Sequence, residues 1–325
     1  MDSEFAARIA APPYYHVIPH IGRESAQFII DNLLRFSFKR HSLAADAIHD
    51  MRKRIALVDH NLGQLGSDIR ISRQVCDEVR AEWLEVPQSR PDRVFLYLHG
   101  GAFCFRMARI QSAMVARWCR QSGARALMPV YPLAPEHPYP AASDDCLAAY
   151  RWLLNQGVRA ENIVICGDSA GGNLTLVTLM RARAEGLPLP AAALMLSPAT
   201  DFSLSGRSAT VNEASDPMFS VAMLRWFGEM YLSEPELHLT PFVSPLTGDF
   251  TGLPPLLFQV GSNEMLLDDS TRAAAKAHGS GVDVQLDVFD GMPHIFQGFG
   301  QLPESKMADR RIARFLEAKA GWARG

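Results

Sequence analysis

The sequence predicts an α/β fold with a mostly parallel central sheet and helices on both of its faces. Expected strands alternate with expected helices over most of the 325 residues, which is the pattern of such a sheet. Several of these strands are almost wholly apolar, as strands covered on both faces are. Connections rich in glycine and proline follow the strands, and a ligand site belongs at those strand ends.

The first part of the chain is predicted to be helical and then to change character. Residues 24–59 contain neither proline nor glycine, and their apolar residues recur at helical spacing. After two glycines at 63 and 66, residues 68–75 and 79–86 are expected to form two strands, with Asp77 and Glu78 between them.

From residue 93 onward the alternation of strands and helices is regular. Ser143 is a candidate N-cap for a helix over residues 143–155, and Gly157 lies just past its end. Residues 201–239 interrupt the alternation with a polar loop followed by a helix over 221–231. The further strands expected are 93–98, 124–130, 163–166, 191–196, 256–260 and 284–289, and the further helices are 110–122, 173–185, 270–278 and 304–320.

Composition narrows the class of protein. Hydrophobic residues make up 48% of the chain, charged residues 21%, and the net charge is −3, which is ordinary globular composition without a basic nucleic-acid footprint. The five cysteines form no C-x-x-C pair, so neither zinc nor a redox dithiol is expected. Residues 1–11 do not resemble a signal peptide, and no apolar run is long enough for a membrane span. The odd number and scattered positions of the cysteines fit reduced thiols, so we expect a cytoplasmic protein.

The strongest chemical signal is the segment 167–171, which has the sequence Gly-Asp-Ser-Ala-Gly between an expected strand and an expected helix. A side chain at Gly167 or Gly171 would clash with neighbouring backbone in so tight a turn. The turn would expose the Ser169 hydroxyl, and the following helix would direct free N–H groups toward an oxyanion. A chance match in a loop is the alternative, and the strand–turn–helix setting disfavours it.

A second signal is the segment 99–103, His-Gly-Gly-Ala-Phe, at the end of the strand 93–98. Acyl transfer needs N–H donors about 3 Å from the developing oxyanion, and a glycine-rich loop exposes such groups. A plain glycine turn is the alternative, but its pairing with the serine turn favours catalysis. His99 is expected to order this loop. The predicted oxyanion hole comprises Gly100, Gly101, Ala102 and Ala170.

A base and an acid are predicted in later loops. His294 follows the last expected strand, which is where a base can reach a serine at the same edge of the sheet. In the loop after strand 256–260, Glu264 comes first and is the preferred acid. Asp268 is the alternative, although it and Asp269 resemble the start of the next helix. The acid would orient His294 and stabilise its imidazolium.

These motifs resemble those of the bacterial hormone-sensitive lipase family (family IV) of carboxylesterases, within the α/β-hydrolase superfamily. The resemblance covers about residues 70–320, and residues 131–142, Tyr-Pro-Leu-Ala-Pro-Glu-His-Pro-Tyr-Pro-Ala-Ala, are similar to another stretch typical of the family. It implies an α/β-hydrolase fold with a helical cap, and a serine carboxylesterase for small esters of short to medium acyl chain. The expected serine chemistry needs no metal or organic cofactor. The net charge of −3 disfavours a nucleic-acid partner, and the lack of an obvious amphipathic lid or membrane-anchoring stretch disfavours a membrane partner.

Other functions use the same residues. A lactone hydrolase, an amidase and a metabolite deacetylase share the triad chemistry, and only the shape of the pocket separates them. A non-catalytic small-molecule receptor is a more distant alternative. The presence of both Ser169 and His294 disfavours the receptor.

Three departures from the family pattern are visible. Ala102 replaces a third glycine but keeps its N–H, and Pro132 stands where arginine is usual. Residues 264–268, Glu-Met-Leu-Leu-Asp, stand where D-P-L-R-D is usual. The resemblance places Glu264 on the triad acid and Asp268 on a second, structural acid.

The resemblance also implies a division of the chain. Residues 1–65 match an N-terminal helical cap segment, and 66–325 match a catalytic domain with a second cap insertion at about 203–240. It allows a homodimer, for which an exposed sheet edge near the last strand is a candidate. The residues expected to contact substrate, with core packing as the alternative for the apolar ones, are Phe36, Phe38, Asp168, Met218, Phe219, Met223, Trp226, Phe227 and Tyr231.

Overall fold

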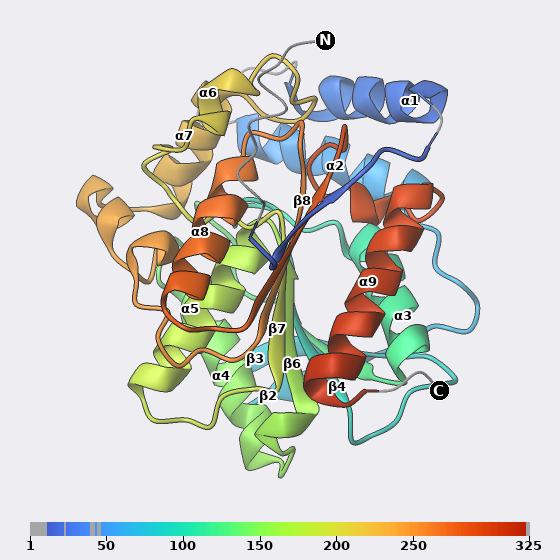
Figure 1. The fold of residues 1–325 in the computed structure, drawn as a ribbon, viewed down its shortest axis with the longest axis vertical. Coiled ribbons are helices and arrows are strands. Elements are labelled where there is room, and N and C mark those ends of the chain that lie inside the picture. Colours follow the sequence, from blue (N-terminus) through green and yellow to red (C-terminus); the bar gives the residue numbers. More distant parts are fainter. Residues whose placement is uncertain (1–11, 23, 40–42, 44–46, 323–325) are drawn as a thin grey trace.

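A nine-stranded sheet runs through the centre of the structure, which is a computed structural model (Figure 1). It describes residues 12–22, 24–39, 43 and 47–322. The strands lie in the order β1-β9-β8-β7-β6-β4-β5-β3-β2. Their bounds are β1 (Tyr15–Ile18), β2 (Arg70–Cys76), β3 (Val79–Glu85), β4 (Val94–Leu98), β5 (Arg125–Pro129), β6 (Ile163–Asp168), β7 (Ala192–Leu196), β8 (Leu256–Gly261) and β9 (Val284–Phe289).

The sheet is mostly parallel, as predicted. Only the pairs β2–β3 and β3–β5 are antiparallel. All five residues of β4 and of β7, and all six of β6 and of β8, are buried, which explains why these strands are almost wholly apolar. The parallel strands β4, β6, β7 and β8 end at the same edge of the sheet, and the loops that leave this edge carry the predicted chemistry.

Strand β1 was not predicted, because its four residues show no marked alternation and lie in the segment expected to be a helical cap. It pairs in parallel with β9, from Tyr15 opposite Leu286 to Ile18 opposite Phe289. Strand β1 therefore covers the edge of β9, and β1 itself forms the outermost strand on that side. The homodimer remains a prediction, and on this side of the sheet it would have to form at β1.

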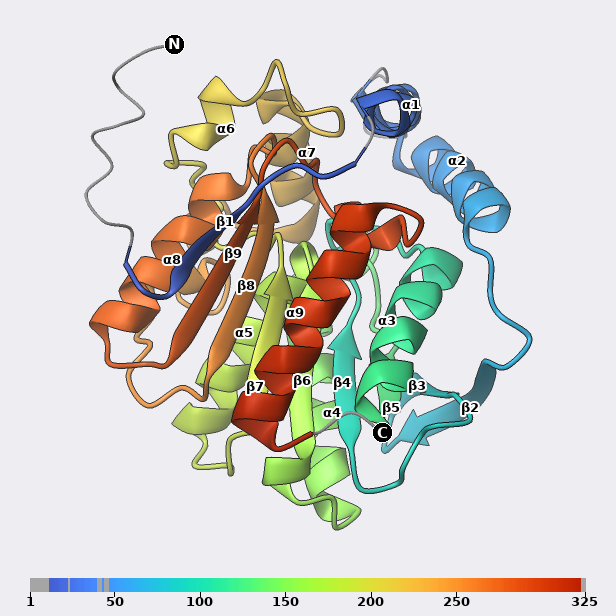
Figure 2. The same ribbon diagram turned by 45° about the vertical axis from the view of Figure 1, so that its right-hand side comes forward.

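Helices cover both faces of the sheet. Helices α3 and α9 pack together over one face, and α4, α5 and α8 cover the other (Figures 1 and 2). The bounds of the helices are α1 (Glu24–Leu34), α2 (Ala47–Leu62), α3 (Ala108–Ser122), α4 (Ala141–Asn155), α5 (Ala170–Ala184), α6 (Ser208–Val211), α7 (Val221–Tyr231), α8 (Leu267–Gly279) and α9 (Pro303–Ala320). None of the helices described is long and apolar enough to cross a membrane.

Several helix boundaries differ from the prediction, and α3, α8 and α9 begin one to three residues earlier than expected. Helix α4 begins at Ala141, so Ser143 is not its N-cap; the Ser143 hydroxyl instead accepts a hydrogen bond from Arg181. Helix α5 begins at Ala170, three residues earlier than predicted, because it continues directly from the serine turn. The segment predicted to be helical over 24–59 contains α1, a π-helical turn at Arg35–Lys39 and α2, which continues to Leu62.

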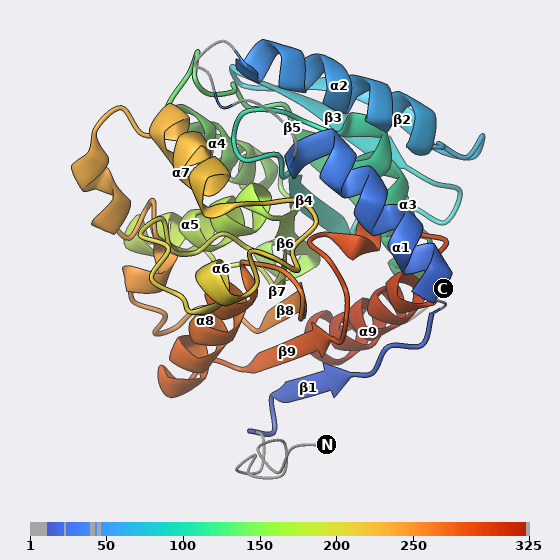
Figure 3. The same cartoon turned by 90° about the horizontal axis from the view of Figure 1, so that it is seen from above.

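Helices α1, α2, α6 and α7, with their loops, lie above the carboxyl ends of the strands (Figure 3). They fall in the two segments predicted to form a cap, and we refer to them as the cap. Side chains of the N-terminal piece bind backbone carbonyls of the other parts. Arg35 donates to the Ser215 carbonyl at 3.1 Å, and Lys39 donates to the Asp216 carbonyl at 2.8 Å. Arg52 of α2 forms a bidentate pair with Glu136 and also donates to the carbonyl of Cys104.

Candidate active site

Ser169 occupies a sharp turn between β6 and α5. Its φ of 54° lies in the left-handed region, which is strained for a residue other than glycine and persists only where the surroundings enforce it. The Ser169 N–H donates to the Leu196 carbonyl at 2.8 Å. A Cβ on Gly167 would collide with the Gly171 carbonyl, and one on Gly171 with the Leu98 carbonyl. The steric reason given for both glycines from the sequence is therefore confirmed.

The glycine loop folds into a compact turn beside Ser169. Gly101 has a φ of 123°, and its carbonyl accepts hydrogen bonds from the N–H groups of Cys104 and Phe105. A Cβ on Gly101 would collide with the Phe105 carbonyl oxygen, so only glycine fits. In the part of the chain that the structure describes, the N–H groups of Gly101, Ala102 and Ala170 have no protein acceptor.

The buried carboxylate of Asp168 joins this loop to the serine turn. It accepts hydrogen bonds from the Gly100 N–H at 2.8 Å, from the Gln111 side chain at 3.2 Å and from the Tyr97 hydroxyl. Burial raises the pKa of Asp168, although these donors oppose the shift. Two findings differ from the expectations. The Gly100 N–H is engaged by Asp168, so it does not point free toward an oxyanion, and Asp168 holds the loop and is not among the residues that line the pocket.

The other expected partners form a buried pair. His294 Nδ1 lies 2.7 Å from Glu264 Oε2, and both side chains are almost completely inaccessible to solvent. The second oxygen, Glu264 Oε1, accepts hydrogen bonds from the Ser197 hydroxyl at 2.7 Å and from the Gly261 N–H at 2.6 Å. Asp268 instead accepts a hydrogen bond from the Ser208 N–H at 3.0 Å. Of the two candidate acids, the structure therefore places Glu264 against His294.

Two aromatic contacts define the surroundings of the histidines. The ring of Phe219 meets His294 edge to face at 4.8 Å between centroids. His99 is buried, stacks on Tyr131 at 3.9 Å, and its Nδ1 lies 2.8 Å from the Gly100 carbonyl. Burial lowers the pKa of His99 to about 3, so this ring is neutral near pH 7. The position of His99 fits the expectation that it orders the glycine loop.

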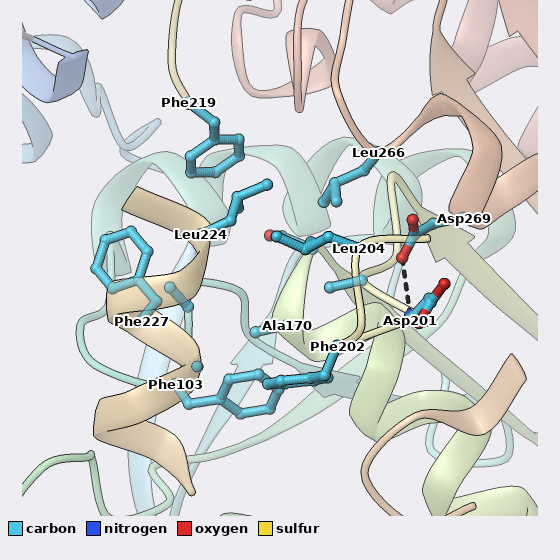
Figure 4. A pocket seen from close by; sticks show the side chains of 14 residues that line it. Phe103, Ala170, Asp201, Phe202, Leu204, Phe219, Leu224, Phe227, Leu266 and Asp269 are labelled. Atoms are coloured by element: carbon cyan, nitrogen blue, oxygen red, sulfur yellow. Dashed lines mark hydrogen bonds between the residues drawn. The ribbon is translucent and has the colours of Figure 1, made fainter. Parts of the chain in front are cut away.

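Ser169 is one of the residues that line a cavity of about 60 Å³. Figure 4 shows this cavity and labels ten of its lining residues. Phe219 and Phe227 line it, as expected. Met218, Met223, Trp226, Tyr231 and Phe38 are packed in the hydrophobic core and are not among the lining residues, and Phe36 is 66% exposed. The residues that line this cavity are Ala102, Phe103, Ser169, Ala170, Ala199, Asp201, Phe202, Leu204, Phe219, Leu224, Phe227, Gly228, Leu266 and Asp269.

Two acidic residues, Asp201 and Asp269, also line this mostly apolar cavity, and no sequence pattern marks them as pocket residues. Asp269 accepts hydrogen bonds from the N–H groups of Thr200 at 2.6 Å and of Asp201 at 2.9 Å, the second of which joins the two acids in Figure 4. Burial raises the pKa of Asp269 to about 7. Asp201 pairs with Arg272 at 2.9 Å, and hydrogen bonds from Ser203, Ser205 and Arg272 hold its pKa below the usual value although burial opposes them.

No cluster of three or more histidine, cysteine, aspartate and glutamate side chains suited to hold a metal ion occurs among the described residues. The groups gathered at the strand ends are therefore a serine, a histidine paired with a buried carboxylate, and unpaired N–H groups beside the serine. This set can carry out nucleophilic acyl transfer.

Sequence similarity to known proteins extends over most of this chain. The sequence profile of the alpha/beta hydrolase fold matches residues 95–298. An acetyl-hydrolase of Streptomyces hygroscopicus is 37% identical over 242 residues, which is 74% of this chain and 80% of that protein. An esterase of Acinetobacter venetianus is 37% identical over 238 residues, or 73% of this chain and 78% of that protein.

A solved structure agrees with these relatives. The crystal structure of an esterase from the bacterial hormone-sensitive lipase family superposes with a TM-score of 0.87 and 37% sequence identity, covering 92% of this chain and 100% of that one. The motifs, the sheet and the strand-end geometry agree with this similarity. The chain therefore belongs to the bacterial hormone-sensitive lipase family of α/β-hydrolases.

Proposed function

We propose that this chain is a serine carboxylesterase that hydrolyses small carboxylic esters through Ser169, His294 and Glu264. Its family, and relatives named esterase and acetyl-hydrolase, support the reaction class. The observation that supports this assignment of residues is that two groups of catalytic type lie at the same edge of the sheet. One is the strained serine beside free N–H groups, and the other is the buried His294–Glu264 pair.

Ester cleavage begins with attack of the Ser169 oxygen on the carbonyl carbon, while His294 accepts the hydroxyl proton. The carbonyl oxygen becomes an oxyanion, which the N–H groups of Gly101, Ala102 and Ala170 stabilise. The alcohol leaves with the proton from His294, and the acyl group stays on Ser169. Water, activated by His294, then attacks the acyl-enzyme and releases the acid.

Glu264 serves His294 throughout this cycle. By accepting a hydrogen bond from the Nδ1–H group of His294, it fixes the tautomer in which Nε2 is the base, and its charge stabilises the imidazolium. The hydrogen bonds from Ser197 and Gly261 use its other oxygen, so the carboxylate cannot rotate away from the ring. Burial strengthens this interaction because water does not screen it.

The preference for small substrates follows from the pocket. Its free volume of about 60 Å³ has room for only a few water-sized groups, and most of its wall is aromatic or aliphatic. Apolar esters of short acyl chain fit this space best. We also propose that the predicted cap pieces, residues 1–65 apart from β1 and about 203–240, select the substrate, because Phe219, Leu224 and Phe227 of the second piece line the cavity.

Replacing the nucleophile tests the proposal. Ser169→Ala should lower turnover of p-nitrophenyl butyrate by about 10⁴-fold or more while the fold stays intact. The matched control is Ser262→Ala, which changes another loop serine at the same sheet edge that contacts Asp290 and Gly291 and not His294. Retention of activity by folded Ser169→Ala would show that the nucleophile lies elsewhere.

A further inference from the structure

Two cavities meet along helix α7. The inner cavity contains Ser169, and the outer cavity, of about 470 Å³, is bordered by exposed residues such as Arg225 and Glu229. Both are lined by Phe202, Leu224 and Gly228. These three residues are therefore the wall between the catalytic pocket and the outer cavity.

The geometry of α7 explains this division. Leu224 and Gly228 are four residues apart and so lie on the same side of the helix. Phe227 lines the inner cavity only, whereas Arg225 and Glu229 line the outer cavity only. The row that contains Leu224 and Gly228 is therefore the ridge between the two spaces, and Phe202 faces this ridge from the loop that follows β7.

The fold does not require a glycine at position 228. A Cβ there would meet only the Phe202 ring, at an ordinary contact distance of 3.6 Å, and the φ of Gly228 is not in the left-handed region. Glycine is the least favourable residue in a helix apart from proline. Neither turn geometry nor close packing explains the glycine in α7. Because Gly228 has no side chain, it leaves a gap in the wall between the two cavities, and we call this gap the low point of the wall.

The sizes of the two cavities indicate what this gap at Gly228 could admit. The inner cavity, at about 60 Å³, holds only a few water-sized groups, so the longer arm of a larger ester must leave it. The outer cavity, with about 470 Å³, adjoins it at Gly228. Its wall combines apolar groups such as Leu232 with polar ones such as Ser203, which suits an extended chain that ends near water.

We propose that the gap at Gly228 is a threshold, that is, an opening in the wall through which the longer arm of an ester passes from the catalytic pocket to the outer cavity. This threshold would set the chain length that the enzyme accepts. The proposal rests on the esterase function given above and adds a specificity-determining residue to it. Short esters fit within the inner cavity, whereas longer ones depend on the missing side chain at position 228.

Gly228→Leu tests this directly. The kcat/KM would be measured for p-nitrophenyl esters from acetate to decanoate and for alkyl acetates from ethyl to octyl, so that each arm of the ester is lengthened in turn. The ratio of kcat/KM for the octanoate to the acetate, or of octyl to ethyl acetate, should fall about tenfold or more. The matched control Ala222→Leu adds the same side chain at an exposed position of α7 and should leave both ratios unchanged.

Two further variants separate the threshold from helix stability. Gly228→Ala should raise the melting temperature by about 2 °C and change the ratio less than Gly228→Leu does. Leu224→Ala lowers the same wall and should raise the ratio for long chains. Circular dichroism and melting temperatures would show that each variant is folded.

The outcomes separate this proposal from the assigned function. If wild-type protein hydrolyses short esters but folded Gly228→Leu shows unchanged ratios in both series, or an equal loss at every length, the threshold is wrong and the esterase function stands. If wild-type protein hydrolyses no ester, the proposed esterase function is wrong, and the proposal for Gly228, which rests on it, is wrong as well.

Discussion

The catalytic edge of the sheet and the cap above it are held in place in different ways. At the edge, backbone groups fix the chemistry: Ser169 N–H binds the Leu196 carbonyl, and Gly261 N–H binds Glu264. In the cap, long side chains reach backbone carbonyls of distant segments, as Lys39 does at Asp216, 177 residues away. This difference suggests that the edge sets the reaction, and that the cap can vary to set the substrate.

The largest effect is expected at the catalytic edge, from the acid that contacts His294. Glu264→Gln keeps the shape but removes the charge, and should lower kcat for p-nitrophenyl butyrate about 10³-fold or more. Asp268→Asn keeps an oxygen for the Ser208 N–H and should change kcat by less than about threefold. A large loss in folded Asp268→Asn together with a small one in Glu264→Gln would reverse the assignment.

A smaller effect is expected where the cap joins the edge. The buried carboxylate of Asp216 accepts hydrogen bonds from the N–H groups of Met218 and Phe219 in the cap and of Met265 beside Glu264. Asp216→Ala would leave these three groups without an acceptor, at a cost of about 1–3 kcal/mol for each one that water does not reach.

The melting temperature of Asp216→Ala should therefore fall by about 5 °C or more. Because Phe219 would no longer be held against His294, kcat/KM should also fall about tenfold, well short of the loss in Glu264→Gln. Asp216→Asn, which retains one acceptor oxygen, is the matched control and should be less affected in both measurements. An unchanged melting temperature and kcat/KM in Asp216→Ala would show that this link is unimportant.

The smallest effect concerns pH and the pocket acid Asp269. Its pKa is raised from 3.8 to about 7 in the folded protein, so between these values the folded state holds a proton that the unfolded state has lost. This group therefore lowers the free energy of unfolding as pH rises from about 4 to about 7, and the loss persists above that range. Asp201 and Arg272 are the charged groups that act on it, in opposite directions.

Melting temperatures of wild type and Asp269→Asn, recorded at about pH 5 and about pH 8, isolate this contribution. Asparagine keeps one acceptor oxygen for the N–H groups of Thr200 and Asp201 but does not titrate, so any other change that it causes shifts its curve by a constant amount. On top of that shift, the variant should gain stability relative to wild type as pH rises. Parallel curves would mean that Asp269 is already ionised at the lower pH.

The catalytic edge could be predicted from the sequence because its geometry is local. Ser169, Glu264 and His294 each lie within a few residues of a strand end, and parallel strands bring those ends to one edge. The steric need for Gly167 and Gly171 could likewise be predicted from the turn alone.

The rest depends on contacts between distant segments. Strand β1 exists because β9 offers it a free edge, which four residues of sequence do not reveal. Ser143 has the side chain of an N-cap, but Ala141 and Ala142 extend the helix and Arg181 uses its hydroxyl. The pocket residues Phe202 and Leu204 follow from the path of a loop over the sheet edge, and no periodicity marks that path.

Covalent labelling of the native protein tests the central claim most directly. Diethyl p-nitrophenyl phosphate transfers a diethylphosphoryl group to a serine that is activated by a neighbouring base. Intact mass and peptide mapping should show one adduct per chain, on Ser169, with loss of esterase activity in proportion to labelling. Labelling should be absent in Ser169→Ala and much slower in His294→Ala. Full labelling at another residue, or complete labelling of Ser169 without loss of activity, would contradict the account.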